Sequence, residues 1–204
     1  MFKNSILKIL LFFMPVYSFS QISINTLYSR SFYSKGDFRG NNFQIGLQKK
    51  LKKNFEANVM LGSYQFSRSD EYYYRTTSSG PFDQLAEFRH LVLINHIDLG
   101  LNYYVIDNKF KVAIGVAGTV SRTITTSPNE YSIVFPDITN FSLPIYQIYY
   151  QDKLKNTSIG PTANINCQYS ISKNAIVGLS FSYLQLKDVL IWSFPINFKY
   201  KLSK

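Results

Sequence analysis

Apolar and polar residues alternate along most of this chain, in stretches separated by short polar breaks. Within 55–62, the apolar residues Phe55, Ala57, Val59 and Leu61 alternate with Glu56, Asn58, Met60 and Gly62. The same period of two recurs at 43–48, 96–103, 110–117, 159–169, 177–183 and 190–202, and a less regular segment at 22–33 precedes them. A period of two predicts β-strands, and no segment after residue 21 has a convincing helical period. The pattern therefore predicts eight strands.

The connections between these strands alternate in length. Three are short and polar, around 52–54, 107–109 and 172–174, and four at the opposite end cover about 34–41, 67–90, 121–156 and 185–189. Tight turns at one end and long loops at the other are typical of an outer-membrane barrel. We therefore predict an all-β fold: an eight-stranded antiparallel up-and-down transmembrane β-barrel, with both termini at the short-turn end. Residues 131–150 either form a surface recognition loop or extend the barrel wall as a hairpin.

The glycines indicate which face points inward. Seven fall in predicted strands, and all except Gly118 lie on the polar face. Because an eight-stranded barrel is barely wide enough for its own side chains, small residues belong inside. The lumen is then expected to hold a polar network: Glu56, Asn58, His96, Asp98, Asn102, Lys111 and Lys199. Counting back from the turn at 105–109 places Lys111 opposite Asn102 or Tyr104.

Two prolines fall inside predicted strands, where each removes a donor from the ladder. We expect a local bulge at Pro195, and a position near the loop end of its strand for Pro161.

The first twenty residues have the layout of a cleaved secretory signal. Lys3 and Lys8 provide the positive end, residues 6–16 form a short apolar core, and Ser18 and Ser20 precede the expected cleavage point. Residues 21–204 then form a single barrel domain. Its net charge falls from +10 to +8, because the signal contains two lysines and no acid. Cys167 is the only cysteine, so an internal disulfide is impossible.

The lysines gather at the short turns. Lys49, Lys50, Lys52 and Lys53 are expected at the short-turn rim, where they either contact lipid headgroup phosphates or simply keep the turns soluble. Lysines confined to turns form no continuous basic face, so nucleic acid is not an expected partner. Outer-membrane lipid is the expected one.

Catalytic chemistry has little support in the sequence. His96 and Asp98 share a strand face, as in outer-membrane enzymes that trim lipid A, yet both are expected to point away from lipid. No metal-ligand spacing, phosphate-binding glycine loop or nucleophile elbow is present. We expect no cofactor and no enzymatic activity.

Over residues 21–204 the chain resembles the small eight-stranded outer-membrane barrels, the OmpA-like and OmpW-like group. Its last strand, 192–202, is similar to the alternating aromatic C-terminal signal read by the barrel assembly machinery, except that Ser203 and Lys204 follow it. The resemblance implies a non-enzymatic integral protein of the outer membrane, with loops 67–90 and 121–156 available for an extracellular ligand or for envelope integrity. Two alternatives remain: a narrow channel constricted at Glu56, Asp98 and Lys111, or a soluble lipocalin-like periplasmic carrier with an apolar interior.

Overall fold

The computed structural model describes residues 22–35, 38–52, 54–75, 83–134, 145–150, 153–187 and 189–202. In these residues the strands are β1 (Ile22–Tyr33), β2 (Phe38–Lys52), β3 (Phe55–Arg75), β4 (Asp83–Asp107), β5 (Phe110–Thr126), β6 (Pro128–Val134), β7 (Ile145–Tyr150), β8 (Leu154–Ser170), β9 (Ala175–Leu186) and β10 (Val189–Leu202). The same part of the chain contains no helix long and apolar enough to span a bilayer. The proposed signal segment, 1–20, lies outside the described residues.

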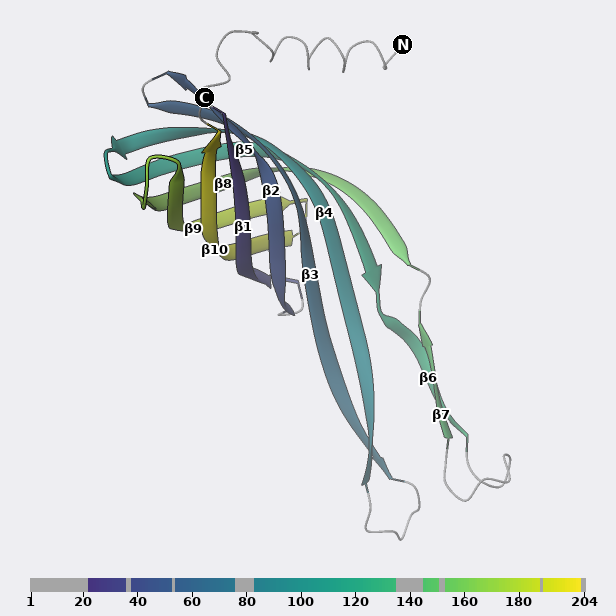
Figure 1. Cartoon of the computed structure of the whole chain (residues 1–204). Helices are drawn as coiled ribbons and strands as arrows, with labels where there is room; N and C mark the ends of the chain where they lie inside the picture. Colours follow the sequence, from purple (N-terminus) through teal and green to yellow (C-terminus); the bar gives the residue numbers. More distant parts are fainter. Residues whose placement is uncertain are drawn as a thin grey trace, which may run out of the picture.

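Eight of these strands close into one barrel in the order β1-β10-β9-β8-β5-β4-β3-β2, and every pair of neighbours is antiparallel (Figure 1). The first and last strands seal it along their full length, from Ile22 opposite Leu202 to Tyr33 opposite Ile191. The predicted fold class is therefore confirmed. The remaining strands, β6 and β7, form a separate two-stranded sheet.

The two ends of the barrel differ as expected. At one end, which we call the short-turn end, the connections occupy only 53–54, 108–109 and 171–174, and the described chain begins and ends there. At the other, the hairpin end, β3 and β4 continue well past their neighbours (Figure 1). The last partner of β3 in β2 is Arg39, opposite Ser67, so eight further residues reach roughly 25 Å beyond that point.

The expected loops at the hairpin end are shorter than predicted. Residues 67–75 and 83–90 are not loop: they form a regular two-stranded ladder that ends with Arg75 opposite Asp83. Within 121–156, β5 continues to Thr126, β8 begins at Leu154, and β6 pairs with β7. A hairpin is therefore observed here, although it forms a sheet of its own and does not extend the barrel wall, and recognition by this segment stays a prediction. A ribbon beyond the barrel encloses no lumen, so nothing requires the alternation of apolar and polar residues by which the other strands were found.

The outward face is apolar, as predicted. Ile114 is 53% exposed and Leu179 is 64% exposed, although both are large aliphatic residues in the middle of strands. Aromatic residues encircle the short-turn end on the same outer face: Phe55, Tyr103, Phe110, Tyr169 and Tyr200. A continuous apolar belt of this size needs hydrocarbon around it. A soluble carrier requires the opposite orientation, so that alternative is wrong.

The inward glycines are needed because the lumen is full. A Cβ added at Gly62 would lie 2.4 Å from His96 Nε2, and one added at Gly115 would lie 2.1 Å from Asn102 Oδ1. At Gly118, which faces outward, an added Cβ meets nothing within 4 Å. The glycine-based assignment of the two faces is confirmed.

The two prolines behave differently from each other. The ladder between β10 and β9 skips Phe194 and Pro195 but resumes in the same register, so the expected bulge at Pro195 is absent. Omitting two pairs is sufficient to accommodate the missing donor. Pro161, contrary to the prediction, is not near the end of its strand, because β8 begins seven residues earlier, at Leu154, and Pro161 is paired with Gly118 of β5. It lies directly beyond Thr162, the last residue of β8 that pairs with β9, so its missing donor interrupts no ladder on that side.

Candidate functional site in the barrel lumen

One strand passes every layer of the lumen. From the hairpin end, the inward side chains of β4 are first apolar at Val92 and Ile94, then polar at His96, Asp98 and Asn102. Each successive inward residue is two positions further along, because the side chains of a strand alternate between faces. The lumen therefore divides into an apolar layer, a middle layer and an ion cluster at the short-turn end.

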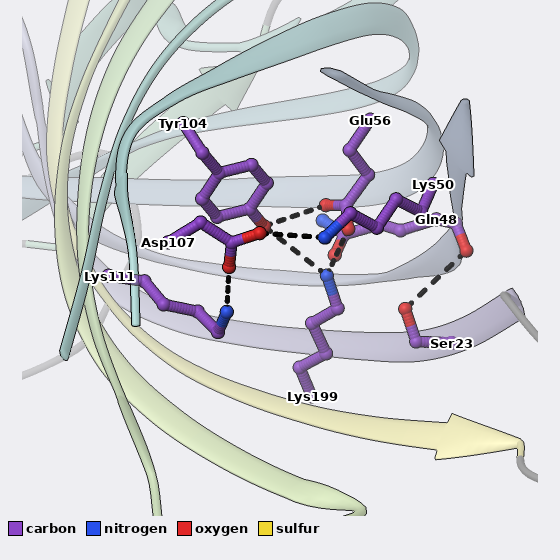
Figure 2. Close-up of polar contacts among 8 residues, drawn as sticks. All are labelled: Ser23, Gln48, Lys50, Glu56, Tyr104, Asp107, Lys111 and Lys199. Atoms are coloured by element: carbon purple, nitrogen blue, oxygen red, sulfur yellow. Dashed lines mark hydrogen bonds and ion pairs between the residues drawn. The ribbon is translucent and has the colours of Figure 1, made fainter. Parts of the chain in front are cut away.

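The ion cluster is built around Glu56. Its carboxylate pairs with the amine of Lys199, and the Tyr104 hydroxyl donates to Glu56 Oε1 at 3.1 Å (Figure 2). The Glu56 and Lys199 side chains are only 6% and 4% exposed, and Tyr104 is also buried. Two strands far apart in the sequence, β3 and β10, thus contribute opposite charges to one buried pair.

Asp107 forms the second part of the cluster. It is the last residue of β4, at the short-turn end of the barrel. Its carboxylate accepts hydrogen bonds from Lys111 and from Lys50 Nζ, the latter at 2.6 Å. Burial alone would raise the pKa of Asp107, but the hydrogen bonds and charges of Lys111 and Lys50 outweigh it and lower the pKa below its ordinary value. Figure 2 shows both lysines converging on this carboxylate.

This pairing corrects two expectations. Lys111 lies opposite Asp107, not opposite Asn102 or Tyr104, because the turn is only two residues long and the register shifts between Tyr104 and Ile106. The shift leaves Val105 and Ile106 both exposed on the outer face and brings Asp107 to the lumen side. Lys50, expected at the headgroup rim, instead shares an inward position with Glu56, its cross-strand partner.

The middle layer holds the candidate catalytic pair. His96 Nδ1 lies 3.0 Å from Asp98 Oδ1, and the Thr119 hydroxyl donates to the same oxygen at 2.7 Å. The imidazole stacks on the Tyr64 ring at 4.8 Å and its side chain is completely buried. Both residues point inward, as expected, and neither faces lipid. His96 Nε2 has no hydrogen-bond partner in the described part of the chain.

Amide and hydroxyl groups fill the rest of this layer. On β8, Asn166 donates to Asn164 at 2.6 Å and accepts from Ser180, which in turn accepts from Asn197. The two expected amides lie against glycines: Asn58 beside Gly100, and buried Asn102 beside Gly115. The structure thus brings the predicted lumen residues into the barrel but distributes them over separate clusters.

The hairpin end of the lumen is apolar, which the sequence reading missed. Phe66, Ile94 and Ile191 are 0% exposed, and they form one cluster with Tyr33, Tyr64, Val92, Leu184 and Leu186. The Tyr33 and Phe66 ring centroids are 5.2 Å apart, and the Tyr64 ring stacks on Phe66. We call this set the apolar plug. Extending the alternation of β3 and β4 by a few residues would have revealed Tyr64, Phe66 and Ile94 on the inward face.

The expected rim lysines have different environments. Lys49 is partly exposed and lies opposite Ala57, which fits an outward position at the short-turn end. Lys52 ends β2, and Lys53 lies outside the described residues. Lys109, in the next short turn, places its amine 5.2 Å from the centroid of the Tyr169 ring. Contact of these lysines with headgroups stays a prediction.

Three participants were absent from the expected network: Tyr104, Asp107 and Thr119. Tyr104 follows Asn102 by two positions and could have been predicted, because alternate residues of a strand share a face. Asp107 was hidden by the register shift before it, and Thr119 lies beyond the end of the predicted strand 110–117, which continues to Thr126 in the structure. No three His, Cys, Asp or Glu side chains gather as a possible metal site in the described ranges.

The closed antiparallel wall, the apolar outer belt and the filled lumen define the class: this chain is an eight-stranded β-barrel of the outer-membrane type. No protein-family model matches the chain, and no curated protein sequence matches it.

Solved structures of bacterial outer-membrane proteins share the fold. The attachment invasion locus protein Ail of Yersinia pestis, solved with the heparin analogue sucrose octasulfate, has a TM-score of 0.52 at 11% identity, over 89% of this chain and 98% of that chain. Neisserial surface protein A has a TM-score of 0.53 at 12% identity, over 91% and 98%. OprG from Pseudomonas aeruginosa has a TM-score of 0.51 at 10% identity, over 91% and 97%. The suspected resemblance to small outer-membrane barrels is confirmed at the level of fold.

Proposed function

We propose that this protein is a non-enzymatic, non-conducting barrel of the bacterial outer membrane that presents two hairpins at the cell surface. The short-turn end then faces the periplasm, as in barrels of this class, and the β3–β4 and β6–β7 hairpins project outward. Binding residues are often carried by projecting segments on a rigid scaffold, so these hairpins are the natural surface for an extracellular partner or for contacts that maintain the envelope.

The apolar plug is the observation that supports a closed lumen. Dehydrating an ion is costly, and hydrophobic constrictions exclude water as well. Phe66, Ile94 and Ile191 occupy the lumen with no exposed surface at all. The residues expected at a channel constriction are also engaged: Glu56 with Lys199, Lys111 with Asp107, and Asp98 with Thr119. This arrangement favours a sealed barrel over a narrow channel.

Conductance across a planar lipid bilayer tests this part of the proposal. The refolded protein should give no discrete current steps. A variant carrying Ile94→Ala and Ile191→Ala should leak ions, because it removes two fully buried side chains from the plug. Wild-type currents equal to those of the variant would refute the closed lumen. A band that shifts on boiling confirms that both proteins are folded.

Protease treatment of intact cells tests location and orientation. Cleavage should fall between β3 and β4, at 76–82, and leave a membrane-embedded remainder that still changes mobility on heating. Cleavage within 171–174 in intact cells would mean that the barrel has the opposite orientation. Recovery of the whole chain in the soluble periplasmic fraction would overturn the proposal altogether.

The absence of enzymatic activity has its own test. His96 is enclosed by Tyr64, Asp98 and the wall at Gly62, so a lipid could not reach it without unfolding the middle layer. His96→Ala should leave lipid A composition unchanged in cells that express equal amounts of folded barrel. A change in acylation would restore the catalytic hypothesis.

A further inference from the structure

The ion cluster contains more positive than negative charge. Lys50, Lys111, Lys199 and Lys201 influence one another electrostatically and share two carboxylates, Glu56 and Asp107. Among the described residues of the cluster, four lysines against two carboxylates leave a formal charge of +2. Like charges this close repel one another, and a partly buried site screens them less than open water does. Lys50 is partly exposed and Lys201 is exposed to solvent at the mouth, and the excess positive charge favours an anion there.

Lys201 is the lysine without a partner. It lies opposite Ser23, which is buried on the lumen side, so its strand position points inward at the short-turn mouth. Its backbone amide is bonded to Asn174 at 2.8 Å, but no described residue forms an ion pair with its amine. Asp107, the nearest candidate, already accepts from Lys50 and Lys111.

Gln48 adds a second observation at this mouth: it is one of seven described residues with a buried side-chain atom that has no hydrogen-bond partner. The residue is 5% exposed, its side-chain oxygen has no hydrogen-bond partner in the described structure, and Figure 2 shows the side chain extending toward Lys50 and Glu56. Its backbone carbonyl accepts from Ser23 at 3.4 Å, which fixes the strand but leaves the amide oxygen unsatisfied. A buried carbonyl oxygen without a donor is unusual and costly.

These two needs specify the chemistry of the missing group. Lysine amines require acceptor oxygens, whereas the Gln48 oxygen requires a hydrogen-bond donor. An anion that carries negative oxygens and one hydroxyl meets both requirements. Inorganic phosphate keeps a P–OH at neutral pH and has this combination. A phosphomonoester has it only in its singly charged form, because its second pKa is about 6, and sulfate lacks it. Access is from the short-turn end alone, because the apolar plug fills the other end and the Lys50 side chain is 40% exposed at the mouth.

We propose that the short-turn mouth of the barrel binds a phosphate group that retains a hydroxyl, either inorganic phosphate or a phosphomonoester in its singly charged form. Lys201 and Lys50 contact its charged oxygens, and Gln48 accepts a hydrogen bond from its hydroxyl. The ligand sits above the Glu56–Lys199 pair and leaves that pair intact.

Isothermal titration calorimetry on the refolded barrel tests the site. The protein is held in an uncharged detergent at neutral pH and constant ionic strength, then titrated with inorganic phosphate, glycerol 3-phosphate or sulfate. Phosphate should bind saturably at one site and at least ~10-fold more tightly than sulfate. Tighter binding of glycerol 3-phosphate would identify an organic monoester as the ligand, and weaker binding would identify free phosphate.

Three variants locate the site. Lys201→Gln should weaken phosphate binding at least ~10-fold. Gln48→Leu should remove the preference for phosphate over sulfate. Lys187→Gln, at the hairpin end, should change neither. Equal binding of sulfate and phosphate by the wild type, undiminished binding by Lys201→Gln, or no saturable heat would each overturn the proposal. Because conductance is measured separately, a leaking barrel would refute the closed lumen without touching this site.

Discussion

Replacing Glu56 by glutamine should destabilise the barrel more than any other single polar change in the ion cluster. The substituted side chain would be nearly isosteric but uncharged, so Lys199 would lose its counter-ion while remaining only 4% exposed. The Tyr104 hydroxyl would also donate to a neutral oxygen in place of a carboxylate. The change isolates charge from shape.

The magnitude follows from burial. Removing one partner of a buried ion pair typically costs about 3–5 kcal/mol, because the other charge is left uncompensated. Weakening one charge-assisted hydrogen bond costs less, at most about 1.5–3 kcal/mol, and is part of the same loss. We therefore expect a loss of about 3–5 kcal/mol in the free energy of unfolding. Asp107→Asn is the matched comparison. Asp107 lies at the mouth and one of its two lysine partners, Lys50, is 40% exposed, so we expect a smaller loss, of about 1 kcal/mol.

Urea unfolding in lipid vesicles measures both values. Trp192 is the only tryptophan and lies on the outward face, so its fluorescence reports transfer from lipid to water. A variant with Glu56→Gln and Lys199→Met together should recover most of the lost free energy, because no unpaired charge remains. A loss below ~1 kcal/mol for Glu56→Gln, or no recovery in the double variant, would refute the buried-pair account.

Three further predictions use other parts of the barrel. Gly62→Ala should raise the population of unfolded barrel and cost about 1–3 kcal/mol, because its Cβ would overlap His96; Gly118→Ala, with open space around it, should lie within ~0.5 kcal/mol of wild type by the same urea assay. Cys167, exposed on the lipid face, should resist a membrane-impermeant maleimide in vesicles and react fully once the chain is unfolded; rapid labelling of the folded barrel would contradict its placement. The lowered pKa of Asp107 adds stability above the unfolded carboxyl pKa of about 3.9, and this stability is lost as pH falls through the folded value. The stability difference between wild type and Asp107→Asn should therefore be present at pH 7 and shrink as the pH falls below the unfolded carboxyl pKa of about 3.9. A difference that grows on acidification would reverse the sign of this argument.

The membrane-embedded part of the fold was predictable because two environments act on every strand there. Lipid outside and a crowded lumen inside force opposite chemistry on alternate residues, as at Val59 and Glu56 on β3. Glycine added a second signal, since Gly62 and Gly115 occupy places where a methyl group would overlap a neighbour. Strand number, face and topology all follow from these constraints.

The signal disappears where one of the two environments is missing. Beyond Ser67 and His90 the β3–β4 ribbon has no lumen, and the sequence there was read as loop although the backbone ladder continues to Arg75. The plug was missed for a related reason: Tyr64 and Phe66 face inward, yet they are as apolar as the lipid-facing residues. Polarity alone does not separate the two faces at that level.

Partner choice inside the lumen depends on register, and register is set by local irregularities that alternation does not reveal. Tyr104 remains opposite Ala113, but the shift after it moves Asp107 across to Lys111, and this single step decides which lysines share a carboxylate. Glu56 and Lys199 come from strands that are not neighbours in the barrel, so they meet across the lumen and not along the wall. The alternation of side chains along each strand thus decides which residues point into the lumen. The register shift and the curvature of the closed wall decide which of those residues contact one another. The excess charge at the mouth is a consequence of that second step. Asp107 pairs with two lysines and Glu56 with one, so Lys201 has no carboxylate partner among the described residues and is available to an anion from outside the chain.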